Sequence, residues 1–446
     1  MARQLFGTDG IRGKAGDPPL DKPTAFALGA ALGTWAKGQS SAPKVLLGMD
    51  TRESGPWLAE AVAAGLVSAG VEPHFAGLLT TPGVAYNTKH GPYVAGVMIS
   101  ASHNPYEDNG LKVFDHSGFK LPDAQELILE EQILKIRENA IVPDCSLPLH
   151  EELANHYLEF LCSTFPYSLK GMRVVLDCAN GAASLLAPRL FTQLGAEVVT
   201  IANSPDGRNI NAGVGALHTD HVRAAVLEHK ADVGVAFDGD ADRAIFKSAS
   251  GSRVDGDAVL LICARLFKAS GHLRGNLVVA TVMSNLGLEV ALRKEGITLA
   301  RTNVGDKYVL EEMIRSGSNL GGEQSGHVIF PEFATTGDGM LTALRVLEAM
   351  VTSGKTLDEL THGFDVFPQL LVNVRIGARR PLEELPALQS VIADCEKDFG
   401  SNGRVLVRFS GTEPLARVMV EGNDEAKVEY HANAIAATLQ QAMGLK

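Results

Sequence analysis

Cysteine is scarce and long apolar runs are missing in this chain of 446 residues. Its five cysteines are scattered, odd in number and without C-x-x-C spacing, which favours buried thiols in a reducing cytoplasm. The most apolar stretches, such as AVLLICARLF, are short and carry charge, so none of them can span a bilayer. The first residues, MARQLFGTDGIRG, lack the apolar core of a signal peptide. We therefore expect a cytoplasmic protein with no membrane partner.

Excess positive charge is also missing, and so are three common ligand-binding or catalytic motifs. The net charge of −12 and the pI near 5.6 argue against a nucleic acid as partner, because nucleic acids bind basic surfaces. Any affinity for phosphate must therefore come from a local group of Arg and Lys. No G-x-G-x-x-G fingerprint occurs, and GKT at 354–356 does not end a P-loop, because Ala349 stands at the leading glycine position. No G-x-S-x-G motif occurs either, which excludes the common hydrolase arrangement.

One pattern is repeated three times: a β-branched apolar run, a polar or glycine-containing loop, and then an apolar-periodic helix. It begins at KVLLGMD (44–50), MRVVLDCANGAAS (172–184) and NLVVATVMSNLG (276–287). Continuous apolar strands that alternate with helices are typical of parallel sheets buried on both faces. At roughly 100–200 residues per domain, the length suggests three or four domains. We predict an α/β protein of three similar α/β domains with mixed, mainly parallel sheets.

The C-terminal part has a different, α+β pattern. Strands are expected at 369–377, 404–411 and 415–422, and a helix from about Asp424 to Met443. We place the four domains at 1–150, 151–254, 255–367 and 368–446, and we expect them to surround a central cleft. No low-complexity segment or long charge run occurs, so short linkers are expected between them.

Three carboxylates at alternate positions follow the apolar strand ADVGVAF. They are Asp238, Asp240 and Asp242 in FDGDADR, where a tight loop can direct all three onto one hard divalent cation. The loop is not an EF-hand, because Arg243 and Ala249 occupy the positions of its glycine and glutamate. A solvated acidic turn is the alternative. The position after a strand, where open α/β sheets bind ligands, favours a metal site.

A second polar segment, SASHNP, follows the strand-like VAGVMIS. Ser102 is a candidate nucleophile here, with His103, Asn104 and Lys112 nearby in the sequence. A hydroxyl needs a base, a cation or a metal to react. Taken alone, Ser102 is more often an ordinary turn serine.

Two further segments carry polar groups suited to a phosphosugar. In GGEQSGH, Glu323 and Ser325 can both bond vicinal sugar hydroxyls, with His327 beside them, although a capping turn is equally compatible. In RFSGTEPLAR, hydroxyls, a glycine turn and two guanidinium groups can clamp a phosphate, unless they form a solvated turn. The clamp residues are Arg408, Ser410, Gly411, Thr412 and Arg417. Arg12, between glycines in GTDGIRG, is a weaker candidate for contact with an anion.

Each expected domain thus supplies one polar loop of a different chemical kind: a nucleophile, a metal site, a hydroxyl-binding loop and a phosphate clamp. Together they indicate phosphoryl transfer on a phosphosugar. The chain also resembles the α-D-phosphohexomutases, whose SASHNP, DGDADR, GEQSGH and RFSGTEP motifs it contains in that order over its whole length. Within that family, Gln324, GTDGIRG and TTGDG (335–339) are similar to the bacterial branch that acts on glucosamine phosphates. The branch that acts on mannose and glucose phosphates more often resembles GEMSGH.

The resemblance implies a role for each matching residue. Ser102 matches the serine that carries the transferable phosphate and lends an oxygen to the metal. The three aspartates match the ligands of one Mg²⁺ per chain. Around the phosphoserine the family has polar residues that match Arg12, His103, Lys112 and Arg243. Glu323, Ser325 and His327 match the sugar side of the site, and the RFSGTEP residues match the distal phosphate clamp. One departure is the loop NVGDKYV, where some relatives have a histidine and this chain has Asp306 and Lys307.

The implied reaction interconverts glucosamine 6-phosphate and glucosamine 1-phosphate, and feeds the synthesis of UDP-N-acetylglucosamine and cell-wall precursors. Its intermediate is glucosamine 1,6-bisphosphate, which, or a similar hexose bisphosphate, also serves as primer. Lys112, His103 and His327 are the candidate general bases. The alternatives are a phosphomannomutase or phosphoglucomutase, a phosphosugar-binding protein without catalysis, and a simple phosphatase. The resemblance leaves a homodimer open.

Overall fold

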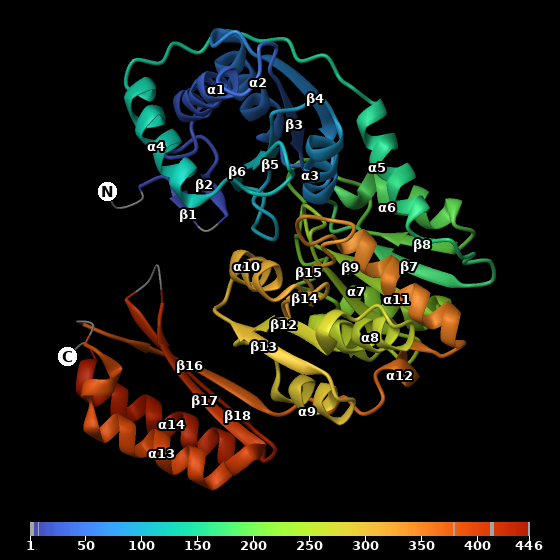
Figure 1. Cartoon of the computed structure of the whole chain (residues 1–446), viewed down its shortest axis with the longest axis vertical. Coiled ribbons are helices and arrows are strands. Elements are labelled where there is room, and N and C mark those ends of the chain that lie inside the picture. The colour runs from blue at the N-terminus through green and yellow to red at the C-terminus, as the bar shows by residue number, and fades with distance from the viewer. Residues whose placement is uncertain (1–3, 8, 378–379, 411–413, 445–446) are drawn as a thin grey trace. The chain divides into compact units, whose positions relative to one another are not determined.

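The computed structural model describes residues 4–7, 9–377, 380–410 and 414–444. These residues form two compact units. Unit 1 comprises the chain up to Val282 together with Ala300–His362, and unit 2 comprises Met283–Leu299 and the chain from Gly363. Figure 1 shows the sheets and helices that build each unit.

The first sheet has six strands in the order β1-β2-β6-β5-β3-β4. Strands β5, β3 and β4 at one side of the sheet are parallel, and β6, β2 and β1 extend it in antiparallel fashion. Helices α1, α2 and α4 share one core with it, and α1 begins where Asp21 accepts the Thr24 N–H. The elements are β1 (Phe6–Gly7), β2 (Gly10–Lys14), α1 (Lys22–Lys37), β3 (Lys44–Met49), α2 (Gly55–Ser68), β4 (Glu72–Leu78), α3 (Thr81–His90), β5 (Ala95–Ile99), β6 (Asp108–Asp115) and α4 (Asp123–Arg137).

Helix α3 lies very close to the sheet at two glycines. A Cβ atom on Gly48 would lie 2.5 Å from a methyl group of Val84, and one on Gly96 would lie 2.1 Å from the Thr88 hydroxyl. Larger residues at these strand positions would push α3 away. The close approach fixes the first turn of α3, which reaches the candidate site.

The second and third sheets also lie largely in unit 1. The second has the order β11-β10-β9-β7-β8, with parallel pairs at β9-β7-β8, and the third has the order β13-β12-β14-β15. Their elements are α5 (Glu152–Ser163), β7 (Arg173–Asp177), α6 (Ala183–Gln193), β8 (Glu197–Ile201), α7 (Asp220–His229), β9 (Val233–Phe237), β10 (Ala244–Ser248), β11 (Arg253–Val254), α8 (Gly256–Ala269), β12 (Leu277–Thr281), α9 (Leu286–Lys294), β13 (Thr298–Thr302), α10 (Asp306–Ser316), β14 (Gly321–Gly322), β15 (Val328–Ile329), α11 (Gly339–Ser353) and α12 (Leu357–Leu360), with a short 3-10 turn at Arg274–Asn276.

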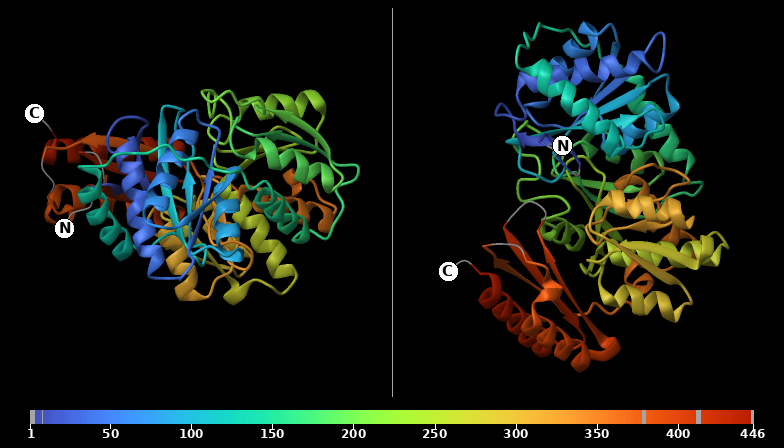
Figure 2. Two further views of the ribbon diagram at one scale, coloured as in Figure 1. Left: turned by 90° about the horizontal axis from the view of Figure 1, so that it is seen from above. Right: turned by 60° about the vertical axis from the view of Figure 1, so that its left-hand side comes forward.

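Unit 2 has an antiparallel sheet of three strands in the order β16-β18-β17. Helices α13 and α14 lie side by side on one face of it, as both figures show (Figures 1 and 2). The segment Met283–Leu299, which contains α9, belongs to this unit as well, and Glu421 accepts the Leu286 N–H at 2.9 Å. The elements are β16 (Gln369–Arg375), α13 (Pro386–Phe399), β17 (Gly403–Phe409), β18 (Leu415–Gly422) and α14 (Glu425–Met443), with 3-10 turns at Leu382–Glu384 and Gly400–Asn402.

The predicted fold class is confirmed. The three repeated units begin with β3, β7 and β12, and the C-terminal strands and helix lie where the sequence places them, within two residues. The antiparallel strands β2, β6 and β10 were not predicted: Arg12 and Lys112 interrupt the apolar pattern of β2 and β6, and β10 is only five residues long. Among the described residues, no helix combines the length and apolar character that crossing a bilayer requires. The four domain boundaries stay predictions.

Candidate active site

Ser102 lies just beyond β5 in a backbone conformation that is rare for any residue but glycine. Its φ is +54°, and its side chain is buried. Its N–H donates to the Ser100 hydroxyl at 2.9 Å, and that hydroxyl donates to Asp50 at 2.6 Å. A strained conformation held by surrounding bonds is common at functional sites, because the bonds offset the strain.

Two side chains hold the carbonyl groups that follow Ser102. The buried Arg52 guanidinium donates to the carbonyls of Ser102 and Asn104, both at 2.9 Å. Asn211, in the loop between β8 and α7, donates to the same two carbonyls at 2.9 and 3.0 Å. Arg52 was not predicted from the sequence, although Asp50-Thr-Arg52 directly follows β3 as SASHNP follows β5. The serine loop is thereby fixed from two sides.

Asp238, Asp240 and Asp242 converge after β9. One carboxylate oxygen of each lies within 4.8 Å of the others, and all three side chains are buried. Asp238 accepts the Ser102 hydroxyl at 2.7 Å, which joins the serine loop to the aspartate loop. Gly239 allows this approach, because a Cβ at this position would lie 2.4 Å from the Ser102 carbonyl oxygen.

The positive groups around the three aspartates do not satisfy all of their carboxylate oxygens. Burial, followed by repulsion from Asp242 and Asp240, raises the pKa of Asp238 well above its ordinary value. Oxygen Oδ1 of Asp240 and Oδ1 of Asp242 are buried and accept no hydrogen bond. Unpartnered carboxylate oxygens that face one another are the donor set of a hard divalent cation. The residues present therefore fit a metal ion.

A chain of alternating charges surrounds this group. Lys112 is buried and lies 2.8 Å from Asp240 and 3.1 Å from Asp9, and these carboxylates outweigh burial and raise its pKa. Lys120 bridges Asp9 and Asp306, each at 2.5 Å, and Arg12 pairs with Asp9. Lys112 therefore keeps its proton and serves as a fixed positive charge.

His103 is held neutral beside Ser102. Arg243 donates to its Nδ1 at 3.0 Å, and that nitrogen lies 3.4 Å from the Ser102 hydroxyl. Burial lowers the pKa of His103 to about 4, and the guanidinium groups of Arg243 and Arg12 add to this effect. Near neutral pH the imidazole is therefore uncharged.

The loop between β14 and β15 adds Glu323, Ser325 and His327. Glu323 accepts the Gly305 N–H at 3.1 Å, and the Ser325 hydroxyl lies 3.5 Å from the same carboxylate. His327 is buried, with Nδ1 3.6 Å from Asp242, while its Nε2 accepts the Gly337 N–H at 3.0 Å. The ring proton is therefore on Nδ1 and faces Asp242. His327 thus lies beside the aspartate group, and its predicted contact with the sugar stays a prediction.

Unit 2 carries the candidate phosphate clamp. Arg408 of β17 lies directly opposite Arg417 of β18, and burial and this like charge lower the pKa of Arg408. Ser410 is buried beyond the end of β17. Gly411 and Thr412 lie outside the described residues. Like charges opposite each other destabilise a sheet, so this pair fits an anion that would bind between them.

Four family models match the chain in order. They are those of phosphoglucomutase/phosphomannomutase α/β/α domain I at residues 3–140, domain II at 155–251, domain III at 255–367 and the C-terminal domain at 371–438. The chain belongs to the α-D-phosphohexomutase family. Its predicted resemblance to that family is therefore confirmed.

Relatives of this phosphohexomutase are similar over their full length. A phosphoglucosamine mutase of Solibacter usitatus is 58% identical over 445 residues, covering 100% of both chains. One of Koribacter versatilis is 51% identical and covers 99% of this chain and 98% of its own. Among solved structures, a phosphoglucomutase/phosphomannomutase family protein of Burkholderia thailandensis has a TM-score of 0.80 at 24% identity, covering 98% and 97% of the two chains. The likeness of that structure supports the fold.

Proposed function

We propose that this phosphohexomutase is a phosphoglucosamine mutase, which interconverts glucosamine 6-phosphate and glucosamine 1-phosphate. Full-length relatives of that activity at 58% and 51% identity support the proposal. The observation that carries the mechanism is the 2.7 Å hydrogen bond between the Ser102 hydroxyl and Asp238. It places a buried serine against a group of carboxylates that fits a metal ion.

One Mg²⁺ per chain is the cofactor that we propose for this group. Asp238, Asp240 and Asp242, with an oxygen carried by Ser102, would hold it. When bound, it supplies positive charge that neutralises phosphoryl oxygens. The Nδ1 atom of His327 lies 3.6 Å from the Asp242 carboxylate, so we propose that His327 positions this metal ligand.

The proposed reaction uses a phosphate on Ser102. The phosphorus–oxygen bond to the serine breaks and a new one forms to the free sugar hydroxyl, whose proton passes to the departing Ser102 oxygen, so that a 1,6-bisphosphate and a free serine hydroxyl result. After this intermediate turns end over end, Ser102 takes back the other phosphate. Lys112, Arg12 and Arg243 stabilise the negative charge of a loose transition state, in which electrostatic stabilisation contributes more than proton removal. His103 stays neutral and keeps Arg243 in place.

The remaining predicted residues contact the substrate. Glu323 and Ser325 bind sugar hydroxyls, and Arg408, Ser410, Gly411, Thr412 and Arg417 bind the distal phosphate. A hexose bisphosphate primes the serine. We infer a cytoplasmic location from the five free cysteines. The predicted homodimer stays a prediction.

Intact mass and turnover of glucosamine 6-phosphate test the proposal. Purified protein treated with glucose 1,6-bisphosphate should gain one phosphate, and Ser102→Ala should gain none and lose more than about 1000-fold in turnover, as expected for loss of the nucleophile. Ser163→Ala is a matched control, because Ser163 is exposed and its hydroxyl donates to the Phe160 carbonyl in its own helix. Full turnover in Ser102→Ala would refute the mechanism. Faster turnover of mannose or glucose phosphates than of glucosamine 6-phosphate would instead assign the protein to the other branch.

A further inference from the structure

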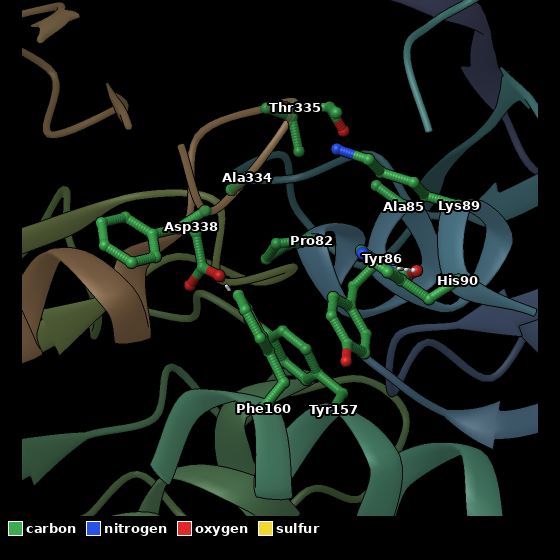
Figure 3. A pocket seen from close by; sticks show the side chains of 12 residues that line it. Pro82, Ala85, Tyr86, Lys89, His90, Tyr157, Phe160, Ala334, Thr335 and Asp338 are labelled. Carbon is green, nitrogen blue, oxygen red and sulfur yellow. Dashed lines mark hydrogen bonds between the residues drawn. The ribbon is translucent and has the colours of Figure 1, made fainter. Parts of the chain in front are cut away.

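The TTGDG segment at 335–339 is singled out by the sequence, but the proposed function assigns it no role. Its Asp338 is buried and accepts the Tyr157 hydroxyl at 2.6 Å. Figure 3 shows Asp338, Tyr157 from α5 and Tyr86 from α3 around one small cavity. That cavity has a volume of about 10 Å³, which holds at most one water, so it is a packed joint between elements and no ligand site.

The first turn of α3 holds the aspartate loop from one side. The Thr81 N–H donates to the Asp240 carbonyl at 3.0 Å, and the Thr81 hydroxyl donates to the Asp240 carboxylate at 2.5 Å. Thr80, the residue before it, caps α3 by accepting the Gly83 N–H. The position of Asp240 therefore depends on where α3 begins.

The first turn of α11 holds the same loop from another side. The Gly339 N–H donates to the Ala241 carbonyl at 2.9 Å. A Cβ on Gly339 would lie 2.5 Å from the Arg243 carbonyl oxygen, so the helix touches the loop backbone directly. Asp338 caps this helix by accepting the Leu341 N–H at 2.9 Å.

Tyr157 connects the two helix starts. Its ring is fully buried beside Tyr86 of α3 and Phe160, and its hydroxyl donates to Asp338 at the start of α11, with the side chain of Thr80 at the start of α3 close by. We propose that Tyr157 and Asp338 are a positioning pair, which fixes the spacing of the two helix starts and thereby the affinity of the aspartate loop for a divalent cation. Neither residue touches the aspartate carboxylates through a hydrogen bond among the described contacts. The proposal rests on the proposed magnesium site.

Isothermal titration of Mg²⁺ into the purified full chain tests the proposal. Tyr157→Phe removes only the hydroxyl, and we expect Mg²⁺ to bind about tenfold more weakly, as is typical when a partner behind the metal ligands is lost. The kcat should fall while KM for glucosamine 6-phosphate stays unchanged, because the sugar contacts are untouched. Asp338→Ser is the second disrupting variant: serine still caps α11 but is too short to reach Tyr157. It should weaken Mg²⁺ binding by a similar factor. This second variant keeps the proposal testable if Tyr157→Phe does not fold.

Tyr93→Phe is the matched control. Tyr93 is also buried in unit 1, and its hydroxyl bonds His74 at 3.2 Å, away from the aspartate loop. It should lower the melting temperature without changing the affinity for Mg²⁺. Unchanged Mg²⁺ binding in both disrupting variants, or equal weakening in Tyr93→Phe, would overturn the positioning role. If wild type itself binds no Mg²⁺, the proposed metal site fails and the positioning role falls with it.

Discussion

Asp338 is a buried carboxyl group whose surroundings favour its protonated form. Burial raises its pKa from 3.8 to about 6, and the charge of Asp242 adds to the effect. The folded protein then binds this proton more tightly than the unfolded chain does. The contribution of Asp338 protonation to the free energy of unfolding is therefore complete below about pH 4 and is lost as the pH rises through about 6.

Asp338→Asn removes this titration and keeps a side chain that caps α11. We expect the free energy of unfolding of wild type, minus that of the variant, to fall by about 2 kcal/mol between about pH 4 and about pH 7. Urea denaturation over that range measures the difference. The exposed Asp17, changed to Asn, controls for the loss of one charge. A difference that does not vary with pH would contradict the prediction.

At the scale of elements, the serine loop depends on a side chain from a neighbouring strand end. Arg52→Ala would leave the buried Asp50 carboxyl without its guanidinium and free the carbonyls of Ser102 and Asn104. Removing one partner of a buried pair costs about 3 kcal/mol or more, so we expect a loss of that size in urea denaturation. Asn211→Ala removes a neutral donor to the same carbonyls and should cost only about 1 kcal/mol. Equal losses would show that the charge of Arg52 does not matter.

The sequence predicts the strands that carry the nucleophile and the metal ligands, but not the residues that position those groups. Ser102 and the three aspartates follow apolar strands, so their place at strand ends could be predicted from the pattern alone. Arg52 also follows an apolar strand, but neither it nor Asn211 could be singled out, because each acts only through contacts made in the folded chain. Tyr157 was missed for a similar reason: on an amphipathic helix, a tyrosine is not distinguished from any other core residue.

At the scale of the whole molecule, the candidate residues divide between two units. Ser102, the aspartates and Glu323 belong to unit 1, and Arg408 and Arg417 to unit 2. Changes in the arginine pair should therefore leave the metal and serine chemistry intact. We expect Arg408→Gln to gain phosphate on Ser102 and to bind Mg²⁺ as wild type does.

The substrate affinity of Arg408→Gln should fall while its stability does not. Loss of a charged hydrogen bond to phosphate costs about 1.5–3 kcal/mol, so KM for glucosamine 6-phosphate should rise about ten- to a hundredfold. Relief of repulsion with Arg417 should raise the free energy of unfolding by up to about 1 kcal/mol.

Arg404→Gln, on the same strand, is the matched control for Arg408→Gln. Arg404 pairs with the buried Glu421 at 2.6 Å and donates to the Ser284 carbonyl, so its loss should lower stability and leave KM unchanged. Initial rates over a range of substrate concentrations, together with urea denaturation, separate the two effects. If Arg408→Gln lost stability as Arg404→Gln does and kept its KM, Arg408 would be a structural residue and the clamp would have to be sought elsewhere.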